Sequence, residues 1–174
     1  ARRAAAYGRV LVHGCSIALR RFEGPEAREL FFLCRPADGD GSDAGRQAEA
    51  VYRAILAVLE GEGARAASIV RETVFLRSLR EDLRSVRGAR ARVLAARGEP
   101  CAAPALTEIE QPPLDERARL QVSIHALLPL PSRPALRLDP VAHGLRVQVG
   151  EQVQLHASGL HGAGANAYEQ ALAM

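Results

Sequence analysis

A chain of 174 residues, of which 48% are hydrophobic, suits one domain or one domain and part of a second. Aromatic residues make up only 4% and Trp is absent, so the core must be built from Leu, Val, Ile and Ala. The net charge is +3, and all 23 basic residues are Arg. The lack of Lys excludes both a Schiff-base lysine and a P-loop lysine, whereas Arg is suited to bind carboxylates through paired hydrogen bonds.

Three cysteines, Cys15, Cys34 and Cys101, show no paired spacing. This pattern argues against a disulfide framework and for a reducing compartment, so we expect a cytoplasmic protein. No apolar run approaches the length of a membrane span and no signal-peptide pattern opens the chain, so no membrane partner is expected. Cys34 has no base beside it in the sequence, and we interpret it as a small buried hydrophobic residue rather than a nucleophile.

The first third of the chain predicts two strands and a helix. Residues 9–19 and 29–34 are apolar and strand-prone, and the Gly-Pro turn between them predicts a hairpin. Over residues 44–60, Val51, Ile55 and further apolar residues recur at helical spacing, so we expect a helix that ends at the glycines that follow.

An acidic loop precedes this helix. Asp38, Asp40, Ser42 and Glu49 occupy positions 1, 3, 5 and 12 of an EF-hand-like calcium loop. The sixth position, which requires Gly for a sharp turn, is Asp43, and the preceding segment is a predicted strand. We therefore expect a solvated loop in which Ser42 or Asp43 caps the helix.

The middle of the chain continues with alternating strands and a helix. Residues 68–76 predict a strand, and apolar residues spaced over 79–94 predict a second helix. Residues 105–111 predict a strand that stops at two prolines. Residues 119–128 alternate strictly between apolar and mildly polar, which places one face on the core and the other toward water or a partner. The predicted class is α+β: a mixed β-β-α-β-α-β-β sheet with both helices on one face.

Two stretches of the chain echo each other at an offset of about 123 residues, the size of a small domain. In the first stretch, Cys34 lies 13 residues before Gln47. In the second, Ser158 lies 12 residues before Gln170 in a predicted helix over 163–173. We interpret the chain as one complete unit followed by the opening of a second copy.

The expected organisation has three parts. Residues 1–128 form the complete domain, and residues 129–144, which contain four prolines, form a linker. Residues 145–174 begin a second repeat with a strand hairpin and a helix. Such a half-unit cannot bury its apolar face alone, so we expect it to dock on the first unit, to pair with another chain, or to belong to a longer parent protein.

This order of elements, with Gln47 opening the first helix, resembles the Rid family of reactive-intermediate deaminases (YjgF type). The family's Val-rich strand ends in Thr-Val-Phe-Leu, and this chain has that sequence at 73–76. The Ser-Gly that closes a family strand is matched by Ser158-Gly159, and in the complete copy the same place holds Cys34-Arg35.

The resemblance implies a trimer with ligand clefts between subunits, and hydrolysis of imines or enamines. In the family, an Arg clamps the substrate carboxylate and a Glu positions water. This chain has Pro104 where the Arg is expected and Gln121 where the Glu is expected. Because a Gln can hold a water molecule but cannot take its proton, the resemblance implies a complete copy without the usual deaminase residues.

The resulting hypothesis is a Rid-like small-molecule-binding or scaffold domain, in a homotrimer or pseudo-trimer, whose ligand is a small carboxylate. No cofactor and no metal are expected, and no catalytic residue is assigned. The alternatives are part of a chorismatase-like tandem hydrolase, because chorismatases contain Rid-like halves, or an active deaminase with non-standard residues. The candidate ligand-binding residues are Cys34, Arg35, Thr107, Gln121, Ser158 and Gly159.

Three further patterns have simpler interpretations. His156 and His161 flank the Ser-Gly pair, but a zinc site needs three or four ligands. The second predicted helix is rich in Arg, which could bind phosphate, but without interleaved aromatics we interpret it as a solvated face and consider a nucleic-acid partner not favoured. Glu108 and Glu110 share one face of a strand and could do acid–base chemistry, although exposed strand carboxylates are commoner.

Overall fold

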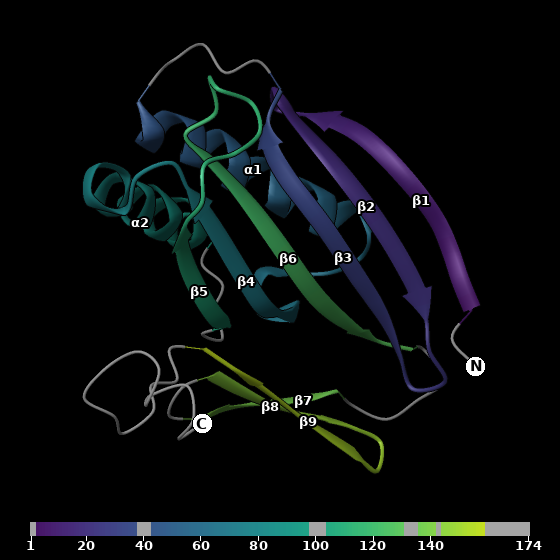
Figure 1. Ribbon diagram of the computed structural model, residues 1–174. Coiled ribbons are helices and arrows are strands. Elements are labelled where there is room, and N and C mark those ends of the chain that lie inside the picture. The colour runs from purple at the N-terminus through teal and green to yellow at the C-terminus, as the bar shows by residue number, and fades with distance from the viewer. Residues whose placement is uncertain (1–2, 38–42, 98–103, 131–135, 142–143, 159–174) are drawn as a thin grey trace.

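The computed structural model describes residues 3–37, 43–97, 104–130, 136–141 and 144–158. Two helices cover one face of a six-stranded sheet, and a three-stranded sheet lies against the other face (Figure 1). The elements are β1 (Arg3–Val12), β2 (Cys15–Glu23), β3 (Ala27–Pro36), α1 (Ala44–Gly61), a 3-10 turn (Ala66–Ser68), β4 (Ile69–Leu76), α2 (Leu79–Ala95), β5 (Ala105–Glu110), β6 (Leu120–Pro129), β7 (Arg137–Val141), β8 (Gly144–Val149) and β9 (Gln152–Ala157).

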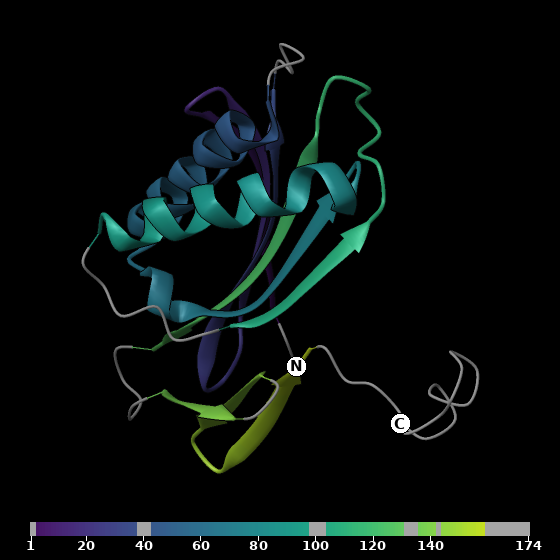
Figure 2. The ribbon, with the colours of Figure 1, turned by 90° about the vertical axis from the view of Figure 1, so that its left-hand side faces the viewer.

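The large sheet has the order β1-β2-β3-β6-β4-β5. The β4–β5 pair is parallel, because α2 carries the chain back across the sheet, and the other pairs are antiparallel. Figure 2 shows α1 and α2 side by side on one face. These features confirm the predicted α+β class. Neither helix in the described part of the chain is long and apolar enough to cross a membrane.

The N-terminal region differs from the predicted hairpin. The run over 9–19 is divided by a tight turn at His13 and Gly14, whose φ angles are 49° and 70°. Positive φ at both central residues is the geometry that two-residue hairpin turns require. The segment therefore forms two paired strands, β1 and β2, and β1 becomes the edge of the sheet.

The main core lies between the helices and the sheet. The apolar residues of β6 face it, and Leu120, Val122, Ile124 and Ala126 are all buried. Asp43 caps α1 by accepting a hydrogen bond from the backbone N–H of Gly45 at 2.8 Å. The periodicities over 44–60 and 119–128 thus predicted these two elements within one or two residues.

A carboxylate is buried within this core. Glu72 on β4 is 1% exposed, and its side chain points in phase with the apolar Val74. Arg90 of α2 donates to it through Nη2 at 2.8 Å and Nε at 3.0 Å, and the Tyr52 hydroxyl of α1 donates at 2.5 Å. The pKa of Tyr52 is raised well above its usual range, mainly by burial and also by the Glu72 charge. This cluster joins both helices to the sheet.

The three-stranded sheet, in the order β7-β8-β9, packs against one end of the opposite face of the large sheet. Its Leu145, Val147 and Val149 form a second core with Val70 and Leu127. Leu127 is on the side of β6 that we expected to face water or a partner, and it is 2% exposed. That expectation is wrong for this residue, because strands of the same chain cover it.

The predicted linker over 129–144 also contains regular structure. Pro129 ends β6, and β7 lies within the range. Pro140 is compatible with β7 because this strand is at the edge of its sheet, where a missing N–H is tolerated. The chain forms a β8–β9 hairpin with Gly150 at a φ of 59°, and the helix predicted over 163–173 lies outside the described residues.

Candidate functional site

The part of the large sheet that the small sheet leaves uncovered contains a cleft of about 500 Å³. It lies at the end of the sheet where β3 ends, opposite the end covered by β7–β9. Five strands (β1, β2, β3, β4 and β6) and the loop after β5 supply polar residues and apolar walls. The lining residues are Arg9, Ser16, Ala18, Leu33, Arg35, Phe75, Gln111, Pro112, Pro113, Leu114 and Gln121.

Strand register explains why these side chains meet. Successive residues of a strand point to opposite faces, so Arg35 points away from the core because its neighbour Cys34 points into it. Arg35 is paired with Ser16 across β2–β3, and Gln121 is paired with Phe75 across β4–β6. The sheet thereby carries residues that are distant in sequence to a single surface.

The charge of this cleft is entirely positive within the described lining. Arg9 is exposed and Arg35 is half-buried, and neither forms an ion pair with any described residue. No Asp, Glu, His or Cys is among the described residues that line it. The cleft can therefore bind an anion, but none of its described lining residues could accept a proton at neutral pH.

Two of the six candidate residues, Arg35 and Gln121, lie together in this cleft. Cys34 lies on the opposite face of the sheet, fully buried, with its thiol 3.8 Å from the carbonyl oxygen of Val51. A hydrogen bond with Cys15 and burial both raise the pKa of the Cys34 thiol far above its usual range, so it is not a nucleophile. This agrees with its interpretation as a packing residue.

The remaining candidates are elsewhere. Thr107 lies on β5, where it pairs with Thr73 of β4, and it is not part of the cleft lining. Ser158 directly follows β9, in the small sheet, and Gly159 lies outside the described residues. The structure therefore does not gather the six candidates into one site.

The two substituted positions also lie in different surroundings. Gln121 faces the cleft, at the position where the resemblance implies an acid. Pro104 is buried just before β5, so no guanidinium enters the cleft from there. The positive charge comes instead from β1 and β3. The sequence analysis missed Arg9, because the face of the sheet on which its side chain lies depends on the turn at Gly14. The alternation of Arg9 with the apolar Val10 was the sequence pattern that could have indicated it.

Gln47, which opens α1, has a structural role. Its side-chain oxygen accepts from the N–H of Arg119 at 2.8 Å, and its amide nitrogen donates to the carbonyl of Arg117 at 3.1 Å. Both groups belong to the segment that leads into β6. The residue therefore connects the start of α1 to the start of β6.

Glu108 and Glu110 are not an acid–base pair in the described structure. Glu108 receives two hydrogen bonds from Arg87 of α2, at 2.5 and 2.8 Å. Glu110 accepts from the N–H of Leu79 at 2.7 Å, at the first turn of α2. Both carboxylates therefore attach α2 to β5.

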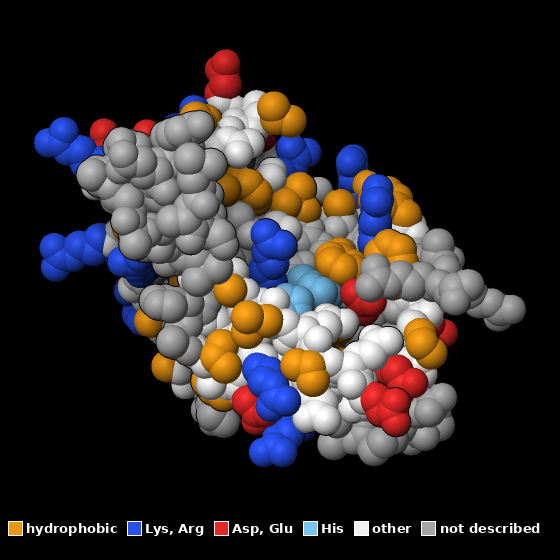
Figure 3. Space-filling view, turned by 60° about the horizontal axis from the view of Figure 1, so that its bottom comes forward, with side chains coloured by type: hydrophobic (Ala, Val, Ile, Leu, Met, Phe, Trp, Pro, Cys, Tyr) orange, Lys and Arg blue, Asp and Glu red, His pale blue; other side chains and the backbone are white. Residues whose placement is uncertain are grey.

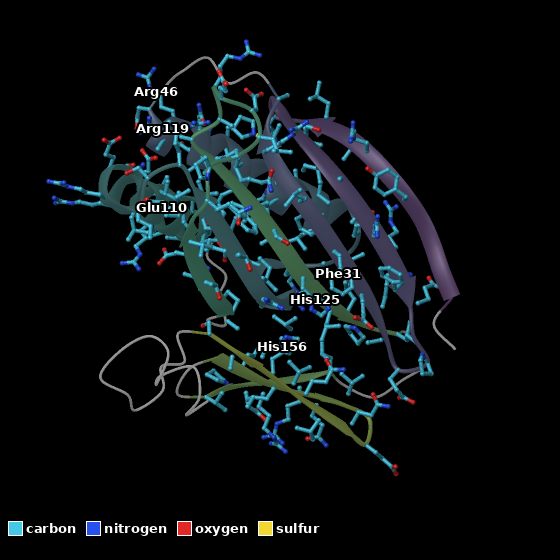
Figure 4. The ribbon with its side chains drawn as sticks, viewed as in Figure 1. Phe31, Arg46, Glu110, Arg119, His125 and His156 are labelled. Carbon is cyan, nitrogen blue, oxygen red and sulfur yellow. The ribbon has the colours of Figure 1, made fainter. Side chains whose placement is uncertain are left out.

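A cluster of rings lies where the small sheet meets the large one (Figures 3 and 4). The His125 ring stacks on Phe31 with centroids 4.1 Å apart, and the His156 ring meets it edge-on at 5.4 Å. The Nε2 atom of His125 is 3.3 Å from a carboxylate oxygen of Glu29. Burial, and secondarily the nearby Arg71 charge, lower the pKa of His156. His156 is therefore neutral at pH 7 and packs as an aromatic ring.

The calcium-like loop and the zinc-like histidine pair lie partly within and partly outside the described residues. Among the described residues, no group of three His, Cys, Asp or Glu side chains could hold a metal ion. Asp38, Asp40 and Ser42 of the calcium-like loop and His161 of the zinc-like pair lie outside the described residues.

No protein-family model matches the sequence, and a search of curated proteins gives no match. Solved structures do match. A proposed translation initiation inhibitor from Salmonella typhimurium is 21% identical, covering 63% of this chain and 89% of its own, with a TM-score of 0.53. E. coli TdcF with bound serine is 17% identical, covering 61% and 90%, with a TM-score of 0.50.

A third match is Rv2704 from Mycobacterium tuberculosis, a member of the YjgF/YER057c/UK114 family, at 18% identity and a TM-score of 0.45. It covers 62% of this chain and 84% of its own. Identities this low establish the fold alone. The resemblance drawn from the sequence is thus confirmed at the level of architecture: this chain shares its α+β fold with the Salmonella protein and with TdcF.

Proposed function

We propose that this Rid-like domain binds a small carboxylate in the cleft and does not hydrolyse imines. The observation that carries the proposal is a cleft lined by Arg9 and Arg35 with no acidic residue among its described lining. Arg35 is the better anchor, because it is half-buried and a guanidinium removed from water interacts more strongly with an anion. Two parallel hydrogen bonds from one guanidinium fit a carboxylate.

The absence of deaminase activity follows from Gln121. Its amide can orient a water molecule or a polar group of the ligand, but it cannot remove a proton from water. The apolar walls, Leu33 and Phe75, would hold the non-polar part of a small ligand. TdcF, which shares the fold, has been solved with bound serine, and this supports a ligand of similar size.

The test combines binding with turnover. Serine, pyruvate and benzoate are titrated into the protein by calorimetry, and we expect saturable binding of at least one of them. Arg35→Gln should weaken it by about 1.5–3 kcal/mol, a factor of ten or more, because a charge-assisted contact is lost. Arg65→Gln is the control for loss of one positive charge, since Arg65 is exposed to solvent and, like Arg35, forms no ion pair with a described residue.

The same protein is then incubated with an amino-acid oxidase and its substrate while imine loss is followed. We expect the spontaneous rate. Acceleration comparable to that of an active Rid protein would favour the alternative, a deaminase that uses non-standard residues. If Arg35→Gln binds the carboxylate as tightly as the parent, the cleft is not the binding site.

Oligomerisation forms part of the proposal. A homotrimer or pseudo-trimer would cover the open end of the sheet, where Leu114 is 96% exposed and Leu11 is 71% exposed. Light scattering coupled to size exclusion measures the assembly directly. A monomer at all concentrations would contradict this part. We keep the cytoplasm as the proposed compartment.

A second candidate function is part of a chorismatase-like tandem hydrolase. The observation that favours it is the order of the small sheet, β7-β8-β9, an antiparallel meander like β1-β2-β3, followed by Ser158. The product of the complete gene would be incubated with chorismate and the mixture separated by chromatography. Formation of pyruvate together with a hydroxylated or dihydroxylated ring acid would support this candidate, and unchanged chorismate would reject it.

A further inference from the structure

A groove runs along the outer surface of the helical layer, between α1 and α2 and on the opposite side of the sheet from the cleft. It consists of two adjoining hollows of about 490 and 570 Å³, which share Glu49 and Arg92 in their linings. None of the residues that line the cleft lines this groove.

Small residues where the helices meet leave room in the groove for a ligand. A Cβ atom added to Gly45 on α1 would lie 3.5 Å from the Cβ of Ser85 on α2. A Cβ atom added to Gly88 would lie 3.4 Å from a guanidinium nitrogen of Arg92. The Arg92 guanidinium therefore lies beside Gly88 in the groove.

The acidic residues of the groove already have partners. Asp43 accepts the capping hydrogen bond from the N–H of Gly45, and Glu49 forms an ion pair with Arg53 one turn along α1. Glu81 forms an ion pair, at 3.0 Å, with the arginine that precedes β6. Glu49 and Glu81 are therefore paired with arginines, whereas Asp43 keeps its charge and is held by the backbone of α1.

Three arginines of the same groove are not neutralised. Arg46, Arg84 and Arg92 are exposed, and none forms an ion pair with a described residue. Arg84 and Arg92 are eight residues apart on α2, a spacing of two i to i+4 steps. Arg46 lies in the first turn of α1. Converging guanidinium groups are suited to phosphate, whose oxygens accept paired hydrogen bonds.

The other hollow has a different lining. Its floor contains Leu56 and Val93, both buried side chains, and His13 of the β1–β2 turn stands at its edge. A flat ring could pack on this apolar floor. The groove thus offers a cationic half and a second half, called the apolar half for its floor, whose lining also includes Arg53 and Arg97. The two halves share Glu49 and Arg92.

We propose that this groove binds a nucleotide, with its phosphates on Arg46, Arg84 and Arg92 and its base over Leu56 and Val93. The proposal rests on three arginines that have no ion pair to a described residue and on the apolar floor beside them. It is independent of the carboxylate cleft.

The probe is adenosine triphosphate carrying a fluorescent label on the ribose, titrated into the complete chain while fluorescence anisotropy is measured. We expect saturable binding that weakens as salt is added, because the contacts are ionic. Unlabelled adenosine triphosphate should compete best and inorganic tripolyphosphate less well. Adenosine should not compete at the same concentration.

Arg92→Gln should weaken binding at least about tenfold, the effect of losing one charge-assisted contact. Arg65→Gln and Arg35→Gln remove the same charge elsewhere and should each change binding by less than about twofold. Arg84→Gln provides a second variant if Arg92→Gln lowers the melting temperature. No saturable binding at millimolar nucleotide, or equal effects of Arg92→Gln and Arg65→Gln, would overturn the proposal. Tripolyphosphate binding as tightly as the nucleotide would overturn the assignment of the apolar half.

Discussion

The ion pair between Glu72 and Arg90 gives the sharpest prediction about stability. Replacing Arg90 with Met keeps most of the side-chain volume. It leaves the Glu72 carboxylate, which is 1% exposed, with the Tyr52 hydroxyl as its one remaining side-chain partner among the described residues. Breaking a buried pair by removing one member costs about 3–5 kcal/mol, because the remaining charge stays out of water. We therefore expect Arg90→Met to be among the most destabilising changes on α2.

The matched control is on the same helix. Arg87 donates to Glu108 with a geometry like that of Arg90 and Glu72, but the Arg87 side chain is 60% exposed whereas that of Arg90 is 19% exposed. The Glu108 side chain is 13% exposed whereas that of Glu72 is 1% exposed, so losing Arg87 leaves a carboxylate that still contacts water. Arg87→Met should therefore cost less stability than Arg90→Met. The contrast between the two variants isolates burial as the cause.

Urea unfolding followed by circular dichroism gives the free energies. Since each kcal/mol lowers the melting temperature of a domain of this size by about 2–4 °C, Arg90→Met should melt about 6–20 °C below the parent. Replacing both Glu72 and Arg90 with Met should recover part of the loss, because no buried charge then remains. If Arg90→Met and Arg87→Met unfold alike, the buried-charge reasoning is refuted.

Three further predictions concern the packing of the sheets. Val122→Asp should prevent folding, because Val122 is 0% exposed and an unpaired carboxylate would enter the main core; a melt like that of the parent would mean that β6 is misassigned. Gly14→Ala should cost about 1–2 kcal/mol because alanine disfavours a φ of 70°, and Gly14→Asn should cost less; equal urea midpoints for both would argue against a strained turn. The pKa of His156 is lowered in the folded state, so the unfolded chain binds the proton more readily and stability should fall as pH drops below 6.5. His156→Gln should flatten this pH dependence in urea titrations made above and below pH 6.5, and an unchanged slope would contradict the assignment.

The sequence predicted best those elements that bury one apolar face against a single core, because their hydrophobic periodicity then follows directly from that packing. Helix α1 and strand β6 each present one apolar face to the main core, so the periods of 3.6 and two residues in the sequence mark them directly. The burial of Glu72 could also have been predicted, because it alternates in phase with Val74 and Leu76 and therefore faces the core with them. Its partner could not be predicted, because many arginines of α2 share the helical spacing and only the packing angle selects Arg90.

The cleft was less predictable because it depends on how strands are ordered in the sheet. Arg35 and Gln121 were both candidates, and they meet because β3 and β6 are neighbours and β4 lies beyond β6. Arg9 joins them only through the two-residue turn at Gly14, which reverses the chain within a run that reads as continuous. A shift of one residue in that turn would direct Arg9 to the opposite face of the sheet.

The positive charge of the cleft is therefore a property of the β1–β2 register as much as of the arginines themselves. This connects the folding of the N-terminal hairpin to ligand binding. A variant that loosens the Gly14 turn should weaken carboxylate binding through Arg9 while leaving Arg35 in place on β3. Gly14→Ala should consequently bind the carboxylate less tightly than the parent but more tightly than a Gly14→Ala, Arg35→Gln double variant. If Gly14→Ala binds with the affinity of the parent despite its lower stability, Arg9 does not contribute and Arg35 alone holds the anion.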